Sequence, residues 1–139
     1  MPEYVANIAI KALEKAKIDI EKAKIGILGL AFRGNIGDTR LTPVIDLVQY
    51  LESYGVRNIV IHDPYAQDNP TKYPLVRDLE KVVLSSDLLI IATDHNMYAE
   101  ELPKLLSNML KKLIVVDGRG VLGNKKVSKN ITYMSIGGP

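Results

Sequence analysis

The residues best suited to bind an anion lie in one glycine-rich stretch, residues 29–43, which reads GLAFRGNIGDTRLTP. It follows a short apolar run and contains Arg33 and Arg40, with Asp38 two residues before the second arginine. Arginine presents a planar fork of N–H donors that matches phosphate or carboxylate oxygens. Two such side chains beside a helix N-terminus predict an anion site built from side chains. The alternative is a plain surface loop, in which Asp38 and Thr42 cap a helix and Arg40 pairs with Asp38.

This stretch does not match the standard phosphate-binding loops. The dinucleotide fingerprint is G-x-G-x-x-G, whereas the glycines here are Gly26, Gly29 and Gly34. The G-K-[ST] sequence of a Walker loop is also absent. We therefore expect the arginine side chains, rather than the glycine backbone, to meet a ligand.

Short apolar runs alternate with helical patterns along the chain. Candidate strands are residues 23–30, 57–63, 87–93 and 113–120, with a further candidate at 131–137. Candidate helices are residues 3–18, 42–55 with Gly55 as C-cap, 75–86, and 94–112 with an interruption before Pro103. This alternation predicts an α/β fold: a doubly wound, mostly parallel open sheet, Rossmann-like and preceded by a connecting helix.

Polar residues follow every one of the first four candidate strands. In an open α/β sheet, ligands bind outside the carboxyl ends of the strands, near the point where the strand order reverses. Besides residues 29–43, the strand ends are His62-Asp63, Thr93-Asp94-His95 and Asp117-Gly118-Arg119-Gly120. Arg119 stands between two glycines directly after a strand, so we expect it to be exposed, rigidly placed and functional.

Asp63 and His95 each allow a functional and a structural interpretation. Asp63 lies where a dinucleotide-binding fold keeps the acid for a ribose hydroxyl, but Pro64 follows at once and favours a turn. His95 has the chemistry of an acid or base. The sequence TDHN is also a plain helix entry in which Asp94 or Asn96 is the cap, and this interpretation is favoured.

Composition excludes several classes of function. The chain has 139 residues, of which 47% are hydrophobic and 24% charged, in keeping with one globular domain. A net charge of +2 without an arginine-rich tract gives no support for nucleic-acid binding. There are no cysteines, two separated histidines and no carboxylate cluster, so we expect no disulfide and no metal site. No apolar run is long enough for a membrane span and no signal segment is recognisable, so we expect a cytoplasmic protein without a membrane partner.

The segment KIGILGLAFRGNIGDTRLTPVIDLVQYL, with the later HDPY, ATDH and DGRG, resembles the C-terminal domain of the UDP-glucose/GDP-mannose dehydrogenase family. The family pattern is G-L-x-F-K, a short spacer and D-x-R-x-S-P, then D-P after the second strand and D-x-R after a later one. The likeness spans roughly residues 24 to 120. Its GLAF and TP variants are most similar to the UDP-N-acetylmannosamine dehydrogenase branch.

The resemblance assigns a role to five residues. Phe32 and Arg33 fall on the family's Phe-Lys pair and Arg119 on the later D-x-R arginine, so these three are implied to bind the nucleotide-sugar. Arg33 replaces a lysine, which keeps the charge but changes a point charge into a fork. Arg40 falls on the first D-x-R arginine, which faces the cofactor, and Asp38 is implied to orient it.

The resemblance also implies an NAD-dependent, two-step oxidation of a sugar C6 hydroxyl to a carboxylate. In the family an N-terminal domain supplies the G-x-G-x-x-G loop and a catalytic cysteine, and this chain has neither. Residues 1–20 are then part of the central connecting helix, and residues 21–139 are the UDP-sugar-binding domain, with no catalytic residue and no activity of its own. The implied partners are a UDP-sugar (UDP-N-acetylmannosamine or UDP-glucose), the N-terminal domain that binds most of the NAD, and a second copy joined through the central helix.

Two other hypotheses remain open at this point. One is a stand-alone Rossmann-like module that binds a nucleotide or regulates another protein without catalysis. The other is a structural dimerisation domain that uses the apolar stripe of the helix at residues 3–18.

Overall fold

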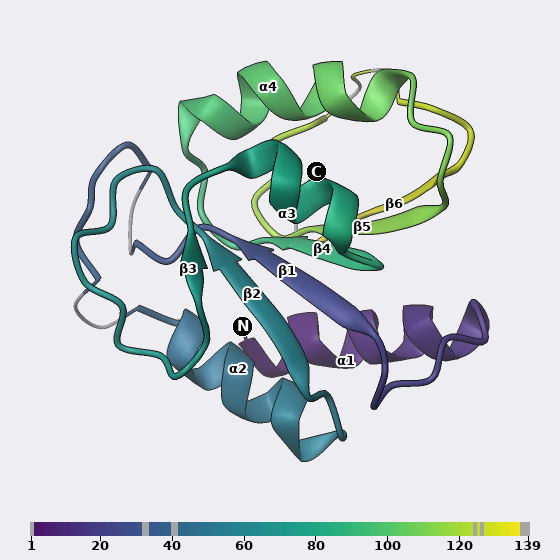
Figure 1. Ribbon diagram of the computed structural model, residues 1–139, viewed down its shortest axis with the longest axis horizontal. Helices are drawn as coiled ribbons and strands as arrows, with labels where there is room; N and C mark the ends of the chain where they lie inside the picture. The colour runs from purple at the N-terminus through teal and green to yellow at the C-terminus, as the bar shows by residue number, and fades with distance from the viewer. Residues whose placement is uncertain (1, 32–33, 40–41, 124, 126, 137–139) are drawn as a thin grey trace.

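The computed structural model describes residues 2–31, 34–39, 42–123, 125 and 127–136, which form one sheet with helices on both faces (Figure 1). The strands are β1 (Lys24–Leu28), β2 (Asn58–His62), β3 (Leu75–Val76), β4 (Leu88–Ile91), β5 (Leu113–Asp117) and β6 (Ile131–Ser135). The helices are α1 (Pro2–Lys15), α2 (Val44–Ser53), α3 (Leu79–Ser85) and α4 (Asn96–Ser107). The sheet order is β3-β2-β1-β4-β5-β6 and every pairing is parallel, which confirms the predicted doubly wound fold.

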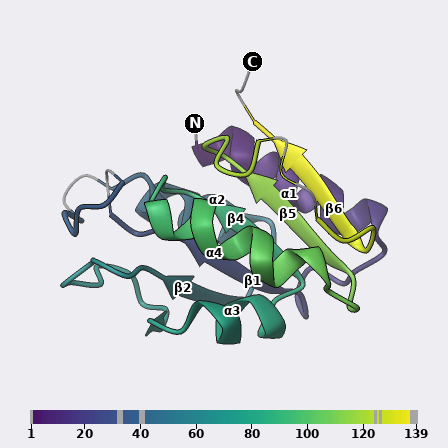
Figure 2. The same cartoon turned by 90° about the horizontal axis from the view of Figure 1, so that it is seen from above.

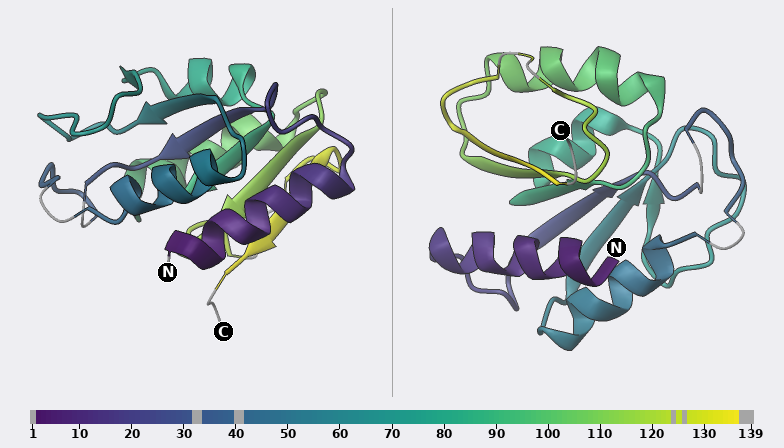
Figure 3. Two further views of the ribbon diagram at one scale, coloured as in Figure 1. Left: turned by 90° about the horizontal axis from the view of Figure 1, so that it is seen from below. Right: turned by 180° about the vertical axis from the view of Figure 1, so that it is seen from behind.

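Each face of the sheet has its own hydrophobic core. Figures 2 and 3 show α1 and α2 on one face and α3 and α4 on the other. Because side chains alternate along a strand, Ile25 and Ile27 of β1 pack into the core under α1 and α2, whereas Leu28 packs into the core under α3 and α4. The strands are therefore buried on both sides, as their continuous apolar runs predict.

The ends of α1 and α2 follow from local capping. Lys17 takes a left-handed φ of 60°, and the Ile18 N–H donates to the Leu13 carbonyl at 3.0 Å, which closes α1 earlier than predicted. At the start of α2 the N-cap position is taken by Pro43 rather than by Thr42, and Thr42 Oγ1 accepts from the Val44 N–H at 3.2 Å from one residue further out. Gly55 ends α2 with a φ of 104°, as predicted.

The prediction for residues 75–86 was wrong at its start. Leu75 and Val76 form β3, which pairs with β2, and the helix begins only at Leu79 after the N-cap Asp78. A strand of two residues has too short a pattern to be distinguished from the first turn of a helix.

The predicted interruption of the helix at Pro103 was also wrong. The described helix α4 continues through Pro103 from Asn96 to Ser107. A proline cannot donate to the carbonyl four residues earlier, here that of Ala99. Lys125 Nζ donates to the Ala99 oxygen at 3.2 Å instead, so this carbonyl still has a partner.

Candidate functional site

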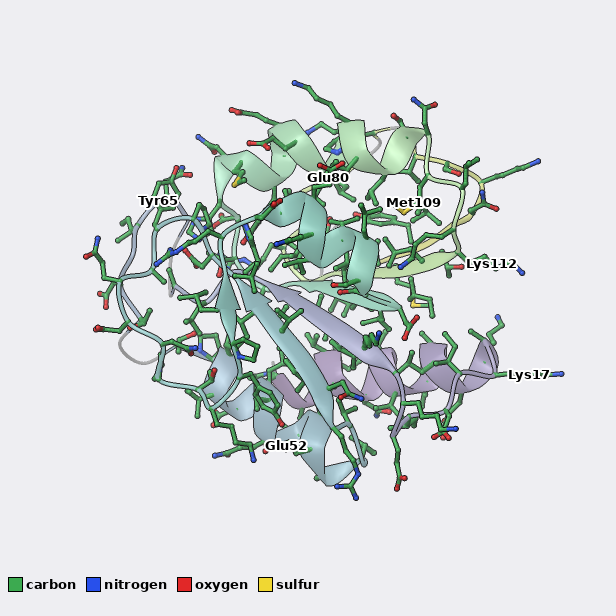
Figure 4. All side chains as sticks on the ribbon, viewed as in Figure 1. Lys17, Glu52, Tyr65, Glu80, Met109 and Lys112 are labelled. Carbon is green, nitrogen blue, oxygen red and sulfur yellow. The ribbon has the colours of Figure 1, made fainter. Side chains whose placement is uncertain are left out.

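The loops that follow β1, β2, β4 and β5 meet at the carboxyl edge of the sheet. The strand order reverses between β1 and β4, so the expected ligand crevice of this fold lies at their carboxyl ends. Figure 4 marks the two edges: Tyr65 lies on the loop after β2 at the carboxyl edge, and Lys17 and Lys112 lie at the opposite edge.

Asp63, directly after β2, is the centre of a hydrogen-bond network at this edge. Its side chain is fully buried, and Oδ2 accepts from the N–H groups of Leu30 and Ala31 at 2.7 and 2.9 Å. Oδ1 accepts from the N–H groups of Tyr65 and Ala66 at 2.7 and 2.8 Å. The carboxylate thus fixes both its own turn and the start of the loop after β1. It has no exposed oxygen for a ribose hydroxyl, so the turn-forming interpretation is the one the structure supports.

Electrostatics keep Asp63 ionised. Burial alone raises the pKa of this carboxyl. The hydrogen bond from His95 and those from the backbone N–H groups of Ala31, Leu30 and Tyr65 outweigh that effect and hold the pKa well below its usual range.

His95 connects Asp63 to the far side of the same loop. The ring is fully buried, with Nε2 at 2.9 Å from Asp63 Oδ2 and Nδ1 at 2.7 Å from the Asn35 nitrogen. Because the Asn35 N–H donates, Nδ1 must be the acceptor and Nε2 the N–H donor to Asp63. Both ring nitrogens are occupied, so the structure does not support His95 as an acid or base toward a substrate.

The cap of α4 comes from the same loop, which corrects the prediction of a cap by Asp94 or Asn96. The Asn96 N–H donates to the side-chain oxygen of Asn35 at 2.9 Å. Asn35 has a φ of 61°, a conformation that asparagine tolerates better than most residues. The loop after β1 and the start of α4 therefore stabilise each other.

Two glycines let the loop after β1 lie against the loop after β4. Gly29 has a φ of 104°, and a Cβ there would overlap the Thr93 side chain. A Cβ on Gly34 would lie 2.6 Å from the carbonyl oxygen of Asp94. Thr93 Oγ1 also donates to the Ala31 carbonyl at 2.8 Å. These glycines serve close backbone packing, which agrees with their failure to match a phosphate-loop pattern.

Three of the five predicted site residues lie outside the described part of the chain. They are Phe32, Arg33 and Arg40. Asp38 is described and half-buried on the loop between β1 and α2, and its role in orienting Arg40 stays a prediction.

Arg119 lies on a turn that Asp117 fixes at the end of β5. The buried Asp117 carboxylate accepts from the N–H groups of Arg119, Val121 and Leu122 at 3.1, 3.1 and 2.9 Å. Its Oδ2 also accepts from the Tyr133 hydroxyl at 2.6 Å. Burial, reinforced by this hydrogen bond to Asp117, raises the pKa of Tyr133 to about 12. The backbone turn that carries Arg119 is therefore held rigidly, as the sequence predicts.

The Arg119 side chain is only weakly held. Its Nη1 donates to the Ala92 carbonyl at 3.4 Å, and Nη2 lies 3.6 Å from Asp94 Oδ1. Exposed ion pairs of this kind contribute about 0–1 kcal/mol, so an incoming anion can compete for the guanidinium. Arg119 also borders a cavity of about 140 Å³, and it is the one charged side chain among the described residues lining it. Pro2 and Val5 from α1, with Pro43 and Leu47 at the start of α2, line the same cavity.

The network around Asp63 was missed by sequence reasoning. The signals HDP and TDH were recognised, but nothing in a single sequence shows that Asp63 and His95 are partners. Asn35 offers a weak signal, because asparagine in a glycine-rich loop often marks a left-handed residue. Tyr133 offers none.

The described residues contain neither a clustered set of potential metal ligands nor a membrane-spanning helix. Among them, no group of three or more histidine and acidic side chains is arranged to hold a metal ion. In the same part of the chain, none of the helices has the length and hydropathy required to cross a bilayer.

Comparisons with known proteins agree on one family. A sequence model of the UDP-glucose/GDP-mannose dehydrogenase family, UDP binding domain, matches residues 26–124. The UDP-N-acetyl-D-mannosamine dehydrogenases of Pyrococcus horikoshii and Methanococcus aeolicus are 33% and 37% identical over 88% and 89% of this chain. The UDP-glucose 6-dehydrogenase of Rhizobium meliloti is 34% identical over 93% of it.

Solved structures give the same result. A UDP-D-ManNAc dehydrogenase from Pyrococcus horikoshii superposes with a TM-score of 0.79 and 32% identity over 97% of this chain. An NDP-N-acetyl-D-galactosaminuronic acid dehydrogenase from Methanosarcina mazei superposes with a TM-score of 0.82 and 25% identity, also over 97%. The chain spans only 28–30% of the length of these relatives and structures.

Proposed function

Because this chain belongs to the UDP-glucose/GDP-mannose dehydrogenase family and matches its UDP binding domain, we propose that it binds the UDP part of a UDP-sugar for an NAD-dependent 6-dehydrogenase. The observation that supports this most strongly is Arg119. It is a weakly paired arginine on a fixed turn, at the carboxyl edge where this fold binds ligands.

A diphosphate suits this site electrostatically. Each charge-assisted hydrogen bond between arginine and phosphate contributes about 1.5–3 kcal/mol. In this proposal Arg119 makes such bonds after it leaves Asp94, from which its Nη2 lies 3.6 Å. We propose Phe32 and Arg33 as further contacts to the nucleotide-sugar, and Arg40, oriented by Asp38, as the residue that faces the cofactor.

The proposed reaction oxidises the C6 hydroxyl of the sugar to a carboxylate with NAD. These 139 residues contain no cysteine, so the thiol that holds the family's covalent intermediates must come from outside them. NAD would be bound mainly by the N-terminal domain of the enzyme. We therefore expect this chain to bind UDP-sugars and not to oxidise them by itself.

The position of α1 supports a partner domain at the same edge. Pro2 and Val5 border the cavity beside Arg119, so a domain joined to this end of α1 would lie next to the ligand. A substrate held between the two domains can drive their closure over NAD. We also propose a homodimer through the helix of which α1 is part.

The relatives suggest the substrate class for this proposal. Both UDP-N-acetyl-D-mannosamine dehydrogenases and a UDP-glucose 6-dehydrogenase match this chain above 30% identity. We propose UDP-N-acetylmannosamine or UDP-glucose as the substrate.

Thermal-shift titrations with UDP, UDP-glucose, UDP-N-acetylmannosamine and NAD test the proposal. A ligand at ten times its dissociation constant stabilises the native state by about 1.4 kcal/mol, so UDP compounds should raise the melting temperature and NAD should not. Arg119→Ala should weaken UDP binding about 10- to 100-fold.

Arg57→Ala is the matched control. Arg57 precedes β2 at the opposite edge of the sheet, is well exposed and pairs only loosely with Glu21 at 4.0 Å. The Arg57→Ala variant removes the same charge as Arg119→Ala but leaves the proposed site unchanged. Stabilisation by NAD but by no UDP compound would contradict the proposal, as would equal losses in the two variants.

A further inference from the structure

We propose that His95 is a positioning residue for the nucleotide-sugar site: it holds the loop between β1 and α2 in its binding conformation by linking Asp63 to Asn35. This inference rests on the proposed function, because the loop is the one that contains Phe32 and Arg33. His95 itself need not touch the ligand.

The loop is held on both sides of Phe32 and Arg33. On the near side, Leu30 and Ala31 donate to Asp63 Oδ2, and the Ala31 carbonyl accepts from Thr93 Oγ1. On the far side, the Asn35 N–H donates to His95 Nδ1 at 2.7 Å. The described residues on either side of Phe32 and Arg33 are therefore each fixed by a hydrogen bond to a side chain of another loop.

His95 is the link that joins the two anchors. The Oδ2 atom that fixes the near side also accepts from His95 Nε2 at 2.9 Å. That hydrogen bond holds the proton on Nε2 and so leaves the Nδ1 lone pair free to accept from Asn35. Asp63 thus sets the tautomer, and the tautomer makes the far anchor possible.

Burial makes this link hard to replace. The His95 side chain is fully buried, and the rings of Tyr65 and Tyr98 lie edge-on to it with centroids 5.0 and 5.5 Å away. A substitution that removes the Nδ1 acceptor therefore leaves the Asn35 N–H without its buried protein partner.

His62 provides an internal comparison. It is also fully buried at the end of β2, and its ring is within hydrogen-bond distance of the Tyr98 hydroxyl and the Arg77 carbonyl, at 2.9 and 3.1 Å. Both partners lie outside the loop between β1 and α2. A buried histidine with a purely structural role is therefore available in the same chain.

Three variants distinguish a role of His95 in positioning the loop from a purely structural role. In His95→Asn the side-chain oxygen can take the place of Nδ1 and still accept from Asn35, while the link to Asp63 is lost. In His95→Gln the amide nitrogen can take the place of Nε2 and still donate to Asp63, while the acceptor for Asn35 is lost. His62→Gln is the control for loss of a buried histidine.

The measurement is UDP affinity by calorimetry, with stability from urea unfolding. We expect His95→Gln and His95→Asn, each of which breaks one half of the link between Asp63 and Asn35, to weaken UDP binding about tenfold or more, and His62→Gln to stay within about threefold of wild type. Equal UDP affinity of His95→Gln and wild type, or equal losses in His95→Gln and His62→Gln, would overturn the inference. If wild type itself does not bind UDP, the proposed function fails, which is a distinct result.

A measurement on the wild-type chain keeps the inference testable if a variant does not fold. Nitrogen-15 spectra of the histidine rings should show His95 as the Nε2–H tautomer, and UDP should shift the His95 ring and Asn35 amide signals but not the His62 ring. The other tautomer, or His95 signals that UDP leaves unchanged, would refute the positioning role.

Discussion

Replacing Asp63 by asparagine tests the hydrogen-bond network with almost no change in volume. Oδ2 accepts three hydrogen bonds, from Leu30, Ala31 and His95, and Oδ1 accepts two, from Tyr65 and Ala66. An asparagine has one acceptor oxygen, so whichever way it turns, its NH₂ group faces at least two of these N–H donors.

The size of the effect follows from those lost partners. Each buried donor left without an acceptor costs about 1–3 kcal/mol, and relaxation recovers part of that. We therefore expect Asp63→Asn to lower the free energy of unfolding by about 3–5 kcal/mol at pH 7, a range typical of a broken buried charge interaction. Urea unfolding monitored by circular dichroism measures it. Asp68→Asn, an exposed position in the same loop, should change stability by less than about 0.5 kcal/mol.

The pH dependence supplies a second check. The folded pKa of Asp63 is below its usual range, so its stabilisation is complete above the unfolded value near pH 4 and is lost as the pH falls toward the folded value. The difference between wild type and Asp63→Asn should therefore be constant from about pH 5 to 7 and shrink below about pH 4. Similar midpoints for Asp63→Asn and Asp68→Asn at pH 7 would refute the network, as would a difference that grows on acidification.

Three further predictions concern single contacts. Asp94→Asn removes the carboxylate that competes for Arg119, so UDP should bind about two- to fivefold more tightly by calorimetry, and weaker binding would show that Asp94 helps the ligand. Gly34→Ala places a Cβ against the Asp94 backbone, so it should cost about 1–3 kcal/mol in urea unfolding and weaken UDP binding; an unchanged midpoint would contradict the close packing. The raised pKa of Tyr133, about 12, means that its stabilisation is complete below pH 10 and is lost as the pH rises toward 12. Tyr133→Phe should therefore reduce the alkaline fall in stability, and an identical profile would exclude the hydrogen bond to Asp117.

The fold was predictable because its signals are local. The apolar run of β1, the cap at Gly55 and the turn that presents Arg119 each depend on residues adjacent in sequence. β3 was missed because two residues give no periodicity. The continuation of α4 through Pro103, whose freed Ala99 carbonyl accepts from a lysine of a distant loop, also has no local signal.

The sequence predicts where the candidate site lies, but not the hydrogen bonds that hold its loops in place. In a parallel sheet the strand ends lie at the carboxyl edge whatever the ligand, so the position of Arg119 at that edge follows from the sequence, while its role in binding stays a prediction. Asp63 and His95 were recognised one by one, and a structural role was favoured for each. Their pairing depends on two loops that meet only after the sheet has formed, so no local pattern records it.

The most direct test of the account is a titration of the nitrogen-15-labelled chain with UDP, followed by amide spectra. We predict that UDP shifts amides at the carboxyl edge, in residues 34–39, 92–96 and 118–122, and leaves those of Lys24, Arg57 and Lys112 at the opposite edge unchanged. A spectrum that UDP does not alter, or shifts confined to the opposite edge, would contradict the assignment of this edge as a UDP-binding site.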